Sequence, residues 1–435
     1  MALGGGTFTV MNKKLPGSYI NVVSTATANA TLSDRGIVAL GLGLQYSPSG
    51  VFEVTSEILN KDSLKLFCCD AGDDSLRRIR EVLLNARKVY VYNTNDNGSK
   101  ASNTYATAKY AGANGNNIKI SIVEDIDNTS NYVVSTLIGN TVVDKQSVAK
   151  SSKTDALAAN DFVNWKANVA LAANASASMT GGTSSQGVGA TSSQNALNAF
   201  EKYTFNVLCM GSDSATINNM IISYTKRLRD ETGKKFQCVV YNADGDHEGV
   251  VNVVTRENSG NYNMVYWVAG ALAGCPLNRS LTNRIYDGEY TPIANETQSQ
   301  LESYIDGGKF AFHKVGDDVR VLMDINTLKT TTAEKNDDFK SNQTIRVIDQ
   351  IASDIATIFN TRYIGAVQNS ESGRALFKAE IVSHHQELQA MNAIEGFSAG
   401  DVTIAQGTEK GAVVVSDAVT ITGAMTKLYM TVYVS

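Results

Sequence analysis

The sequence predicts a multidomain α/β (α+β) protein with an α/β core, an inserted β-rich domain, a C-terminal α+β domain and extended strand arms at both termini. Three observations support this fold class. Apolar runs typical of buried strands alternate with helical patterns in two separate parts of the chain. A long segment between these parts is polar and rich in Gly, Ser, Thr and Asn. Both chain ends carry short strand-like runs.

The length of the chain also predicts several domains, because 435 residues exceed one typical hydrophobic core. Changes in composition and pattern indicate where the boundaries fall. The expected parts are an N-terminal arm (1–28), a first core segment (29–94), the inserted β-rich domain (95–194), a second core segment (195–318), the C-terminal α+β domain (319–412) and a C-terminal strand arm (413–435).

Composition limits the classes of protein and partner. Hydrophobic residues make up 43% and charged residues 19% of the chain, which is typical of a soluble globular protein. The formal net charge is −5 and no basic run occurs, so nucleic acid is not expected as a partner. No apolar stretch approaches the length of a bilayer span, so a membrane is not expected as a partner either.

The cysteines indicate a reducing compartment. Their number is odd, no C-x-x-C occurs, and the runs 66–69 and 207–209 have the character of apolar strands. We therefore expect buried free thiols and folding in a reducing cytoplasm. The cysteines are Cys68, Cys69, Cys209, Cys238 and Cys275.

The N-terminal arm precedes any core element. Residues 1–30 are too polar and glycine-rich for a signal peptide. Pro16-Gly17 predicts a turn, and residues 19–23 then form a short strand candidate. Most terminal extensions are merely frayed, but a pairing strand at each end is typical of subunits that link to copies of themselves. The residues expected to pair with another subunit here are Tyr19, Ile20, Val22 and Val23.

The first core segment contains a strand, a helix and a second strand. Residues 36–44 are apolar on both faces, as in a central strand that is covered by helices on both sides. Asp73 and its neighbours offer an N-cap for a helix over 76–83, whose apolar residues share one face. Residues 88–93 form the next strand.

The inserted segment shows β patterns and no residues with recognisable chemistry. Short alternating runs at 118–123, 132–137 and 141–148 predict strands. The stretch 179–187 predicts a flexible connector because it is rich in Gly, Ser and Thr.

The α/β pattern then resumes in the second core segment. Strands are predicted at 205–210 and 236–241, joined by a helix over 217–228 that Gly233 ends. The natural topology for such a unit is a parallel pair with a right-handed crossover. An apolar helix at 262–274 follows.

The C-terminal domain begins with a strand at 319–326. The strongest helical pattern of the chain follows at 341–362, with five isoleucines on one stripe. A second helix is predicted at 372–394, and two or three strands lead to the terminus. The polar residues opposite the isoleucine stripe, which we expect to lie on the wetter face, are Asp349, Gln350, Ser353 and Asp354.

The chain ends in a strand with period-two alternation of polar and apolar side chains. A terminal strand can leave its own domain and pair with a sheet edge elsewhere, where main-chain hydrogen bonds give affinity and alternate side chains give register. The alternative is an ordinary edge strand that closes its own sheet. The apolar residues expected to make the intersubunit contact are Leu428, Met430, Val432 and Val434.

Nucleotide-binding and calcium-binding motifs are incomplete. Gly41-Leu42-Gly43 follows a strand, but Tyr46 breaks the G-x-G-x-x-G pattern, and no P-loop motif occurs. The loop 242–248 alternates acceptors as a calcium loop does, but His247 stands where that loop needs glycine. We therefore expect an ordinary acidic turn there.

The histidines do not predict a metal site or a catalytic site. His384 and His385 lack the spacing of a helical zinc site, so we expect them to be solvated helix residues. His313 has no cysteine or carboxylate at a fixed spacing. The sequence therefore predicts no catalytic residue, no metal, no cofactor and no enzyme activity.

Several phrases of the sequence resemble contractile phage tail sheath proteins. Residues 107–118, TAKYAGANGNNI, resemble the family's AKYPGTRGNDI, although Ala111 replaces its proline. Residues 324–328 and 339–349 resemble its DINSLT…FSKNxVIRVLD. Residues 427–432 match its closing strand, and the opening segment before Pro16-Gly17 also matches. The matches keep the family's order over nearly the whole chain, and the shorter sheaths of Gram-positive phages and phage-tail-like bacteriocins are the most similar.

The resemblance implies a structural function. Subunits of this family form hexameric rings that stack helically around a rigid inner tube, are stitched by terminal arms, and contract to drive the tube through an envelope. The implied partners are further copies of this chain, the inner tail tube protein, and baseplate and tail terminator proteins. The implied location is a virion or phage-tail-like particle that is assembled in the bacterial cytoplasm. The residues expected to face the tube, in a densely charged loop before the helix at 341–362, are Lys329, Glu334, Lys335, Asp337 and Asp338.

Two alternatives remain open at this point. The first is a cytoplasmic α/β enzyme or small-molecule-binding protein with a decorated core. The second is the sheath of another injection machine, such as a type VI-like system, whose sheath carries a recycling signal for an unfoldase.

Overall fold

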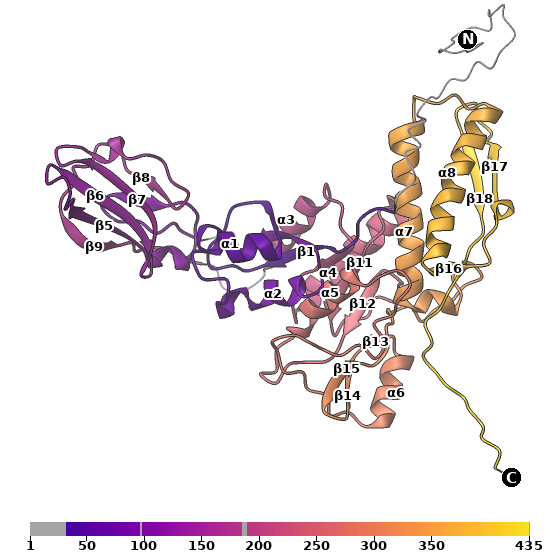
Figure 1. Cartoon of the computed structure of the whole chain (residues 1–435). Coiled ribbons are helices and arrows are strands. Elements are labelled where there is room, and N and C mark those ends of the chain that lie inside the picture. The colour runs from indigo at the N-terminus through magenta and orange to yellow at the C-terminus, as the bar shows by residue number, and fades with distance from the viewer. Residues whose placement is uncertain (1–31, 96–97, 185–188, 435) are drawn as a thin grey trace, which may run out of the picture.

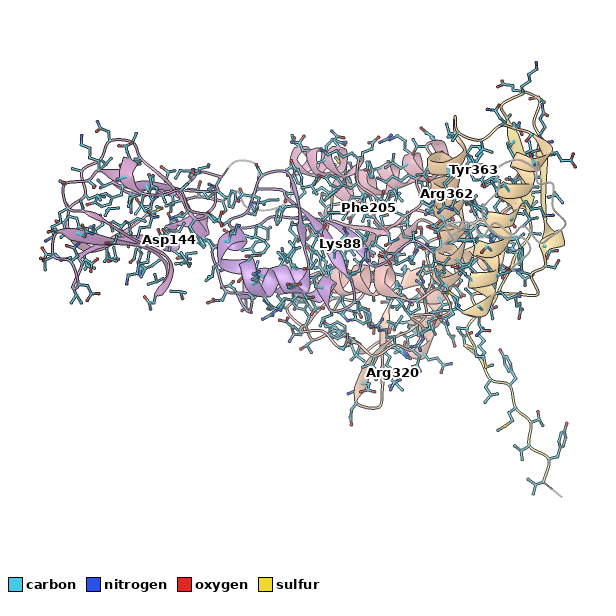
Figure 2. All side chains as sticks on the ribbon, turned by 45° about the horizontal axis from the view of Figure 1, so that its top comes forward. Lys88, Asp144, Phe205, Arg320, Arg362 and Tyr363 are labelled. Carbon is cyan, nitrogen blue, oxygen red and sulfur yellow. The ribbon has the colours of Figure 1, made fainter. Side chains whose placement is uncertain are left out.

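A computed structural model describes residues 32–95, 98–184 and 189–434, so the strand candidate at 19–23 lies outside the described residues. Figure 1 shows three bodies in a row: a β-rich body at one end, a central α/β core, and a helical body at the other end from which the C-terminal segment projects. In Figure 2, Asp144 marks the β-rich body, Phe205 the core and Tyr363 the helical body. Among the described helices, none is both long enough and apolar enough to span a bilayer.

The core contains a seven-stranded sheet with the order β13-β12-β11-β10-β1-β3-β2. All neighbouring pairs are parallel except β2 and β3, and the predicted parallel pairing of β10 with β11 is confirmed. Leu40 of β1 lies between Cys209 and Val91 in the register. The strands are β1 (Ile37–Leu42), β2 (Val51–Val54), β3 (Lys88–Asn93), β10 (Val207–Cys209), β11 (Gln237–Tyr241), β12 (Val250–Val253) and β13 (Lys309–Phe310).

Helices cover both faces of this sheet, as the apolar central strands require. Helices α2 (Arg77–Leu83) and α5 (Met264–Gly274) pack on one face, and α3 (Ala190–Phe200) and α4 (Ala215–Lys226) on the other. Two glycines let α5 approach α2 closely. A Cβ at Gly270 would lie 2.3 Å from the carbonyl oxygen of Val82, so any larger residue there would force the helices apart.

The segment before Cys69 corrects one prediction. Residues 66–69 are not strand-like, because α1 (Ser56–Phe67) runs up to Phe67. Thr55 caps this helix by accepting from the Ile58 N–H, and Cys68 ends it in the left-handed conformation with φ +54°. Four consecutive apolar residues do not distinguish a helix end from a strand.

The inserted body is an antiparallel sheet with the order β7-β6-β5-β9, joined by the pair β4–β8. It contacts the core through the segment after β1. There Gly112 has φ +139°, and a Cβ on it would lie 1.9 Å from the Gln45 carbonyl oxygen, so only glycine fits. The strands are β4 (Ala106–Ala108), β5 (Ile118–Glu124), β6 (Asn131–Ile138), β7 (Thr141–Ala149), β8 (Val163–Trp165) and β9 (Asn174–Ser178).

The helical body consists of α7 (Asn342–Ile358), α8 (Glu371–Ala390) and the hairpin β17 (Val402–Gln406)–β18 (Val413–Asp417), with α8 between α7 and the hairpin (Figure 1). A short pair, β16 (Ile394–Glu395) with β19 (Thr420–Ile421), lies at its base. The helix α6 (Gln298–Asp306) and the hairpin β14 (Phe312–Val315)–β15 (Asp318–Val321) lie beside the core. One-turn π-helical segments extend α4 and α7.

The polar face of α7 is buried, which contradicts the prediction that it is the wetter face. Asp349, Gln350 and Asp354 are all less than a tenth exposed. Each of these residues has a polar partner: Asp349 bonds to Arg229 of the core, Gln350 to Ser33, and Asp354 to Ser33 and to His384 of α8. The isoleucine side packs in apolar clusters with α8 and its surroundings. Hydrophobic patterning missed this contact because an interface made of ion pairs and amides looks like a solvated face.

Candidate assembly surfaces

The C-terminal arm leaves the body after Ala424. Gln343 of α7 fixes its root: the Gln343 amide donates to the Thr422 carbonyl, and Ala424 N–H donates to the Gln343 side chain, both at 3.1 Å. Residues 422–434 form no helix or strand, and the chain extends away from the body (Figure 1). The predicted pairing residues are strongly exposed: Leu428 84%, Met430 72%, Val432 68% and Val434 92%.

Such exposure of several large apolar side chains along one short segment is uncommon on a free surface and is typical of a binding segment. The arm is therefore the main candidate for contact with another subunit. Pairing through these side chains stays a prediction, as does pairing through Tyr19, Ile20, Val22 and Val23, which lie outside the described residues.

The described part of the N-terminal arm is anchored in the same body. Leu32 packs in an apolar cluster with Val347 and Leu388 of the two long helices. Ser33 donates its hydroxyl to the Asp354 carboxylate and accepts from the Gln350 amide at 2.8 Å. The first described residues at the N-terminal end and the root of the C-terminal arm therefore both lie against the helical body.

In the charged loop before α7, both lysines that were predicted to face the tube form ion pairs within the subunit. Lys329 pairs with Asp244, and its N–H donates to Asp246 at 2.6 Å. Lys335 pairs with the buried carboxylate of Glu248 at 2.9 Å. Hydrogen bonds from Thr330 and Lys329 lower the pKa of Asp246 to about 2. Of the five residues predicted to face the tube, Glu334, Asp337 and Asp338 remain exposed acids.

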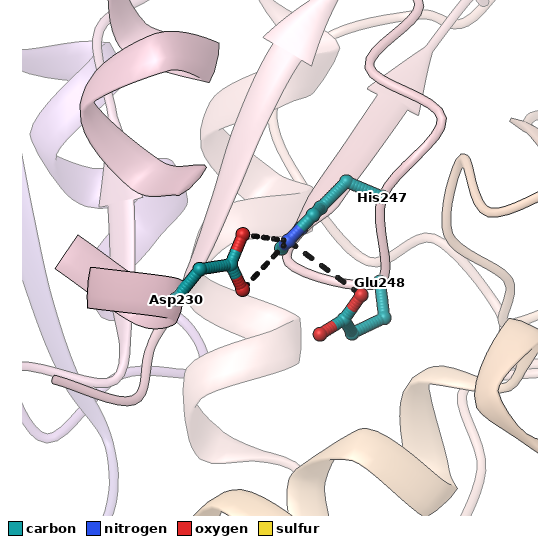
Figure 3. A group of neighbouring side chains, drawn as sticks. All are labelled: Asp230, His247 and Glu248. Carbon is teal, nitrogen blue, oxygen red and sulfur yellow. Dashed lines mark hydrogen bonds and ion pairs between the residues drawn. The ribbon is translucent and has the colours of Figure 1, made fainter. Parts of the chain in front are cut away.

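Asp230, His247 and Glu248 come close enough to suggest a metal site (Figure 3). The proton positions argue against one. Gly249 N–H donates to His247 Nδ1 at 2.9 Å, so a neutral ring carries its proton on Nε2, which points at Asp230 at 3.1 Å. Burial lowers the pKa of His247, which favours the neutral ring. A metal at Nε2 would need the lone pair that this proton occupies, so the group fits an ion-pair network better.

A buried ion pair joins this network to the helical body. Arg229, in the π-helical turn after α4, donates two hydrogen bonds to Asp349 of α7, at 2.6 and 2.8 Å. Their side chains are 3% and 9% exposed. A second pair, Arg346–Asp324 at 3.0 Å, is fully buried nearby. Charged contacts therefore hold α7 against the core.

The prediction that His384 and His385 are solvated is wrong. Both are fully buried, because α8 lies between α7 and the β17–β18 hairpin. His384 Nε2 lies 2.9 Å from Asp354, and His385 Nε2 lies 2.8 Å from Asp417. The carboxylates lie 30 residues before His384 and 32 residues after His385, and no sequence spacing signals such partners. His313 lies on β14, where burial lowers its pKa.

Comparison with known proteins identifies the class of this chain. Three sequence families match consecutive parts: the phage tail sheath protein beta-sandwich domain over 96–186, its central domain over 186–327 and the phage tail sheath C-terminal domain over 334–435. The crystal structure of the sheath tail protein from Desulfitobacterium hafniense superposes with a TM-score of 0.81 at 31% identity, covering 95% of this chain and 99% of that one. The chain belongs to the contractile phage tail sheath family.

Further relatives also support the assignment of this chain to the family. The phage-like element PBSX protein XkdK of Bacillus subtilis is 31% identical over 473 residues, covering all of both chains. The sheath tail protein Lin1278 of Listeria innocua has a TM-score of 0.78 at 26% identity, covering 91% of this chain and 93% of that one. The family and fold class expected from the sequence are confirmed. The chain is a structural tail sheath subunit and not an enzyme, so the enzyme alternative is not supported.

Proposed function

We propose that copies of this subunit assemble into stacked hexameric rings around an inner tail tube, between a baseplate and a tail terminator. Contraction of this sheath would drive the tube through the envelope of a target cell, after synthesis and assembly in the bacterial cytoplasm. The exposed C-terminal arm carries the proposal, because its apolar side chains have no partner within the described subunit. The helical sheath of the anti-feeding prophage, solved in the contracted state, shares the fold with a TM-score of 0.55 at 11% identity, covering 97% of this chain and 99% of that one.

We propose that the arms link subunits by adding strands to a neighbour's sheet. The acceptor we favour is the β17–β18 hairpin, because a two-stranded sheet is marginal alone and gains from further strands. An arm that leaves one body and pairs with the next makes a head-to-tail contact, and such a contact generates helical assemblies when it does not close.

We further propose a role in the assembly for each part of the chain. The segments 1–28 and 413–435 supply the arms, although 413–421 first adds β18 and β19 to the helical body and only the part after Ala424 is free. Residues 319–412 act as an inner domain, 29–94 and 195–318 as the core, and 95–194 as an outer domain. In support, the β-rich body lies at the end of the subunit opposite the helical body from which the C-terminal segment projects (Figure 1).

Negative-stain microscopy of two proteins tests the assembly and the outer domain together. The full chain should form tubes or rings. A chain in which a short linker replaces residues 95–194 should form tubes of smaller diameter. Uniform small particles from the full chain would contradict the sheath assembly, whereas loss of tubes in the shortened chain alone would give the inserted domain a role in the lattice.

We also propose that the loop containing Lys329, Glu334, Lys335, Asp337 and Asp338 faces the tube. Its two predicted lysines are paired internally and Asp337 pairs with Lys340, so Glu334 and Asp338 are the exposed charges that we expect to meet the tube. Exposed ion pairs are worth only about 0–1 kcal/mol each, which suits a contact that must release the tube.

Reversing Glu334 and Asp338 to lysine should reduce co-sedimentation of the tube with assembled sheath at low salt, and less so at moderate salt, because salt screens exposed charges. The same reversal at exposed Asp127 of the inserted domain is the control and should have no effect. Unchanged co-sedimentation of the loop variant at both salts would mean that the tube contact lies elsewhere.

A further inference from the structure

A small cavity lies at the amino ends of three neighbouring strands of the core sheet, where α7 packs against them. Its volume is about 140 Å³, which is room for several water molecules or for one small ion. The segments that lead into β1, β10 and β11 line it, together with one side of α7. The cavity therefore lies where the first described residues of the chain, the core and the helical body meet.

Three cations line this cavity, and two of them, Arg35 and Lys235, form no ion pair with a carboxylate among the described residues. Arg35 donates to the side-chain oxygen of Gln350 at 3.2 Å, and Lys235 donates to the carbonyl oxygen of Arg229 at 3.1 Å. Both acceptors are uncharged. The third cation, Arg346 of α7, has one carboxylate partner.

The two acidic side chains that line the cavity are bonded to other cations. Asp349 accepts two hydrogen bonds from Arg229, at 2.6 and 2.8 Å. Asp34 pairs with Arg87, which does not line the cavity. The positive charges of Arg35 and Lys235 are therefore not neutralised by a direct partner.

Three N–H groups of the two arginines have no hydrogen-bond acceptor in the described part of the chain. They are Nε of Arg35 and both Nε and Nη1 of Arg346, and all three atoms are buried. The whole of Arg346 is only 1% exposed. A buried donor without a partner is costly, and an ordered water or a bound ion is the usual explanation for one in a native protein.

The two guanidinium groups also repel each other. Burial and the charge of Arg346 lower the pKa of Arg35 to about 10, although Asp349 and Asp354 attract it. Water molecules in the cavity would accept hydrogen bonds but would bring no charge to oppose this repulsion. An anion supplies both acceptors and charge, and guanidinium groups are well suited to phosphate-like oxyanions.

We propose that this cavity binds a small inorganic oxyanion of the phosphate or sulfate class, held by Arg35, Lys235 and Arg346. The bound anion links the first described residues to the core and to α7, and so stabilises the junction between the core and the helical body. Ligands of α/β sheets usually bind at the opposite, carboxyl edge, so the proposal does not rest on the fold. The site is a property of the single subunit and is independent of the proposed assembly.

The first test measures chemical unfolding of the unassembled full chain in increasing phosphate at constant ionic strength. A ligand that binds only the folded chain raises the ratio of folded to unfolded molecules about elevenfold when its concentration reaches ten times the dissociation constant. Phosphate also stabilises proteins in general, because it is excluded from their surfaces. The quantity that decides is therefore the difference in this rise between the natural chain and its variants.

Arg35→Met and Lys235→Met each remove one cation from the cavity and should remove most of the rise that phosphate produces in the natural chain. Lys314→Met, at an exposed position of β14, is the matched control and should keep the full rise. An equal rise in all four proteins would overturn the proposal, because the stabilisation would then be the general effect of the salt.

A second measurement locates the anion and needs no variant. Selenate has the shape and charge of sulfate, and its selenium gives an anomalous signal in diffraction from crystals of the full chain soaked in it. The expected result is a peak in the cavity between Arg35 and Arg346. A cavity that holds only water, at a selenate concentration that stabilises the chain in solution, would show that the anion binds elsewhere and that the proposed site is wrong.

Discussion

Replacing Met430 and Val432 with aspartate should abolish tube formation and leave the subunit folded. Both side chains are more than two-thirds exposed in the subunit, so the fold loses nothing when they change. In the proposed assembly they lie on the buried face of an added strand, where an unpaired carboxylate is costly. Negative-stain microscopy measures assembly, and circular dichroism checks the fold.

The matched control lies on the opposite face of the same segment. Lys427→Asp with Thr431→Asp introduces the same two groups on the face that alternation predicts to be exposed, and tubes should still form. Deleting residues 1–22 should also leave a folded subunit that does not form tubes. Tubes of normal length from the Met430/Val432 variant would show that these side chains do not join subunits.

Asp349→Ala should lower the free energy of unfolding by about 3–5 kcal/mol, because it leaves the guanidinium of Arg229 buried without its bidentate partner. The remaining carboxylate near Arg229, Glu248, lies 3.9 Å away and is already paired with Lys335. Chemical denaturation followed by circular dichroism measures the loss, and α7 should detach from the core first.

A neighbouring ion pair provides the control. Arg227 and Glu201 lie 3.0 Å apart, but their side chains are 44% and 45% exposed. Glu201→Ala should therefore cost only about 0–1 kcal/mol. Replacing Arg229 with Met and Asp349 with Leu together should recover much of the stability lost by Asp349→Ala, because neither member of the pair is then left as a buried charge without its partner. Equal losses for Asp349→Ala and Glu201→Ala would contradict a stabilising role for the buried pair.

Sequence periodicity predicted the elements whose burial is apolar. The run at 88–93 became β3 with the same bounds, and the apolar helix at 262–274 became α5 with its first two residues left outside the helix. In both elements the buried positions carry apolar residues. The spacing of those residues along the chain is the periodicity by which the element can be recognised in the sequence. The pair β2–α1 was missed, because α1 buries only a few of its residues and shows no strong apolar stripe.

The polar interior could not be predicted in the same way. Asp349 and Arg229 are 120 residues apart, and His385 meets a carboxylate on a different element. Each of these side chains has the composition of a solvated surface, and only the tertiary fold supplies its partner. The proposed pairing segment is the opposite case, because the alternation of Leu428, Met430 and Val432 is a local pattern that can be read from the sequence alone; the structure shows these side chains exposed, and their pairing stays a prediction.

The point at which the C-terminal arm is fixed to the body limits how far the arm can reach. Gln343 holds the chain as far as Ala424, so the free part begins at Met425. Its ten described residues to Val434 can span at most about 35 Å when fully extended. If the arm joins two subunits as we propose, the neighbour cannot move farther than that from Gln343 of α7 without breaking the link. Large rearrangements of subunits joined in this way would then proceed by rotation about the points of attachment, and not by free separation.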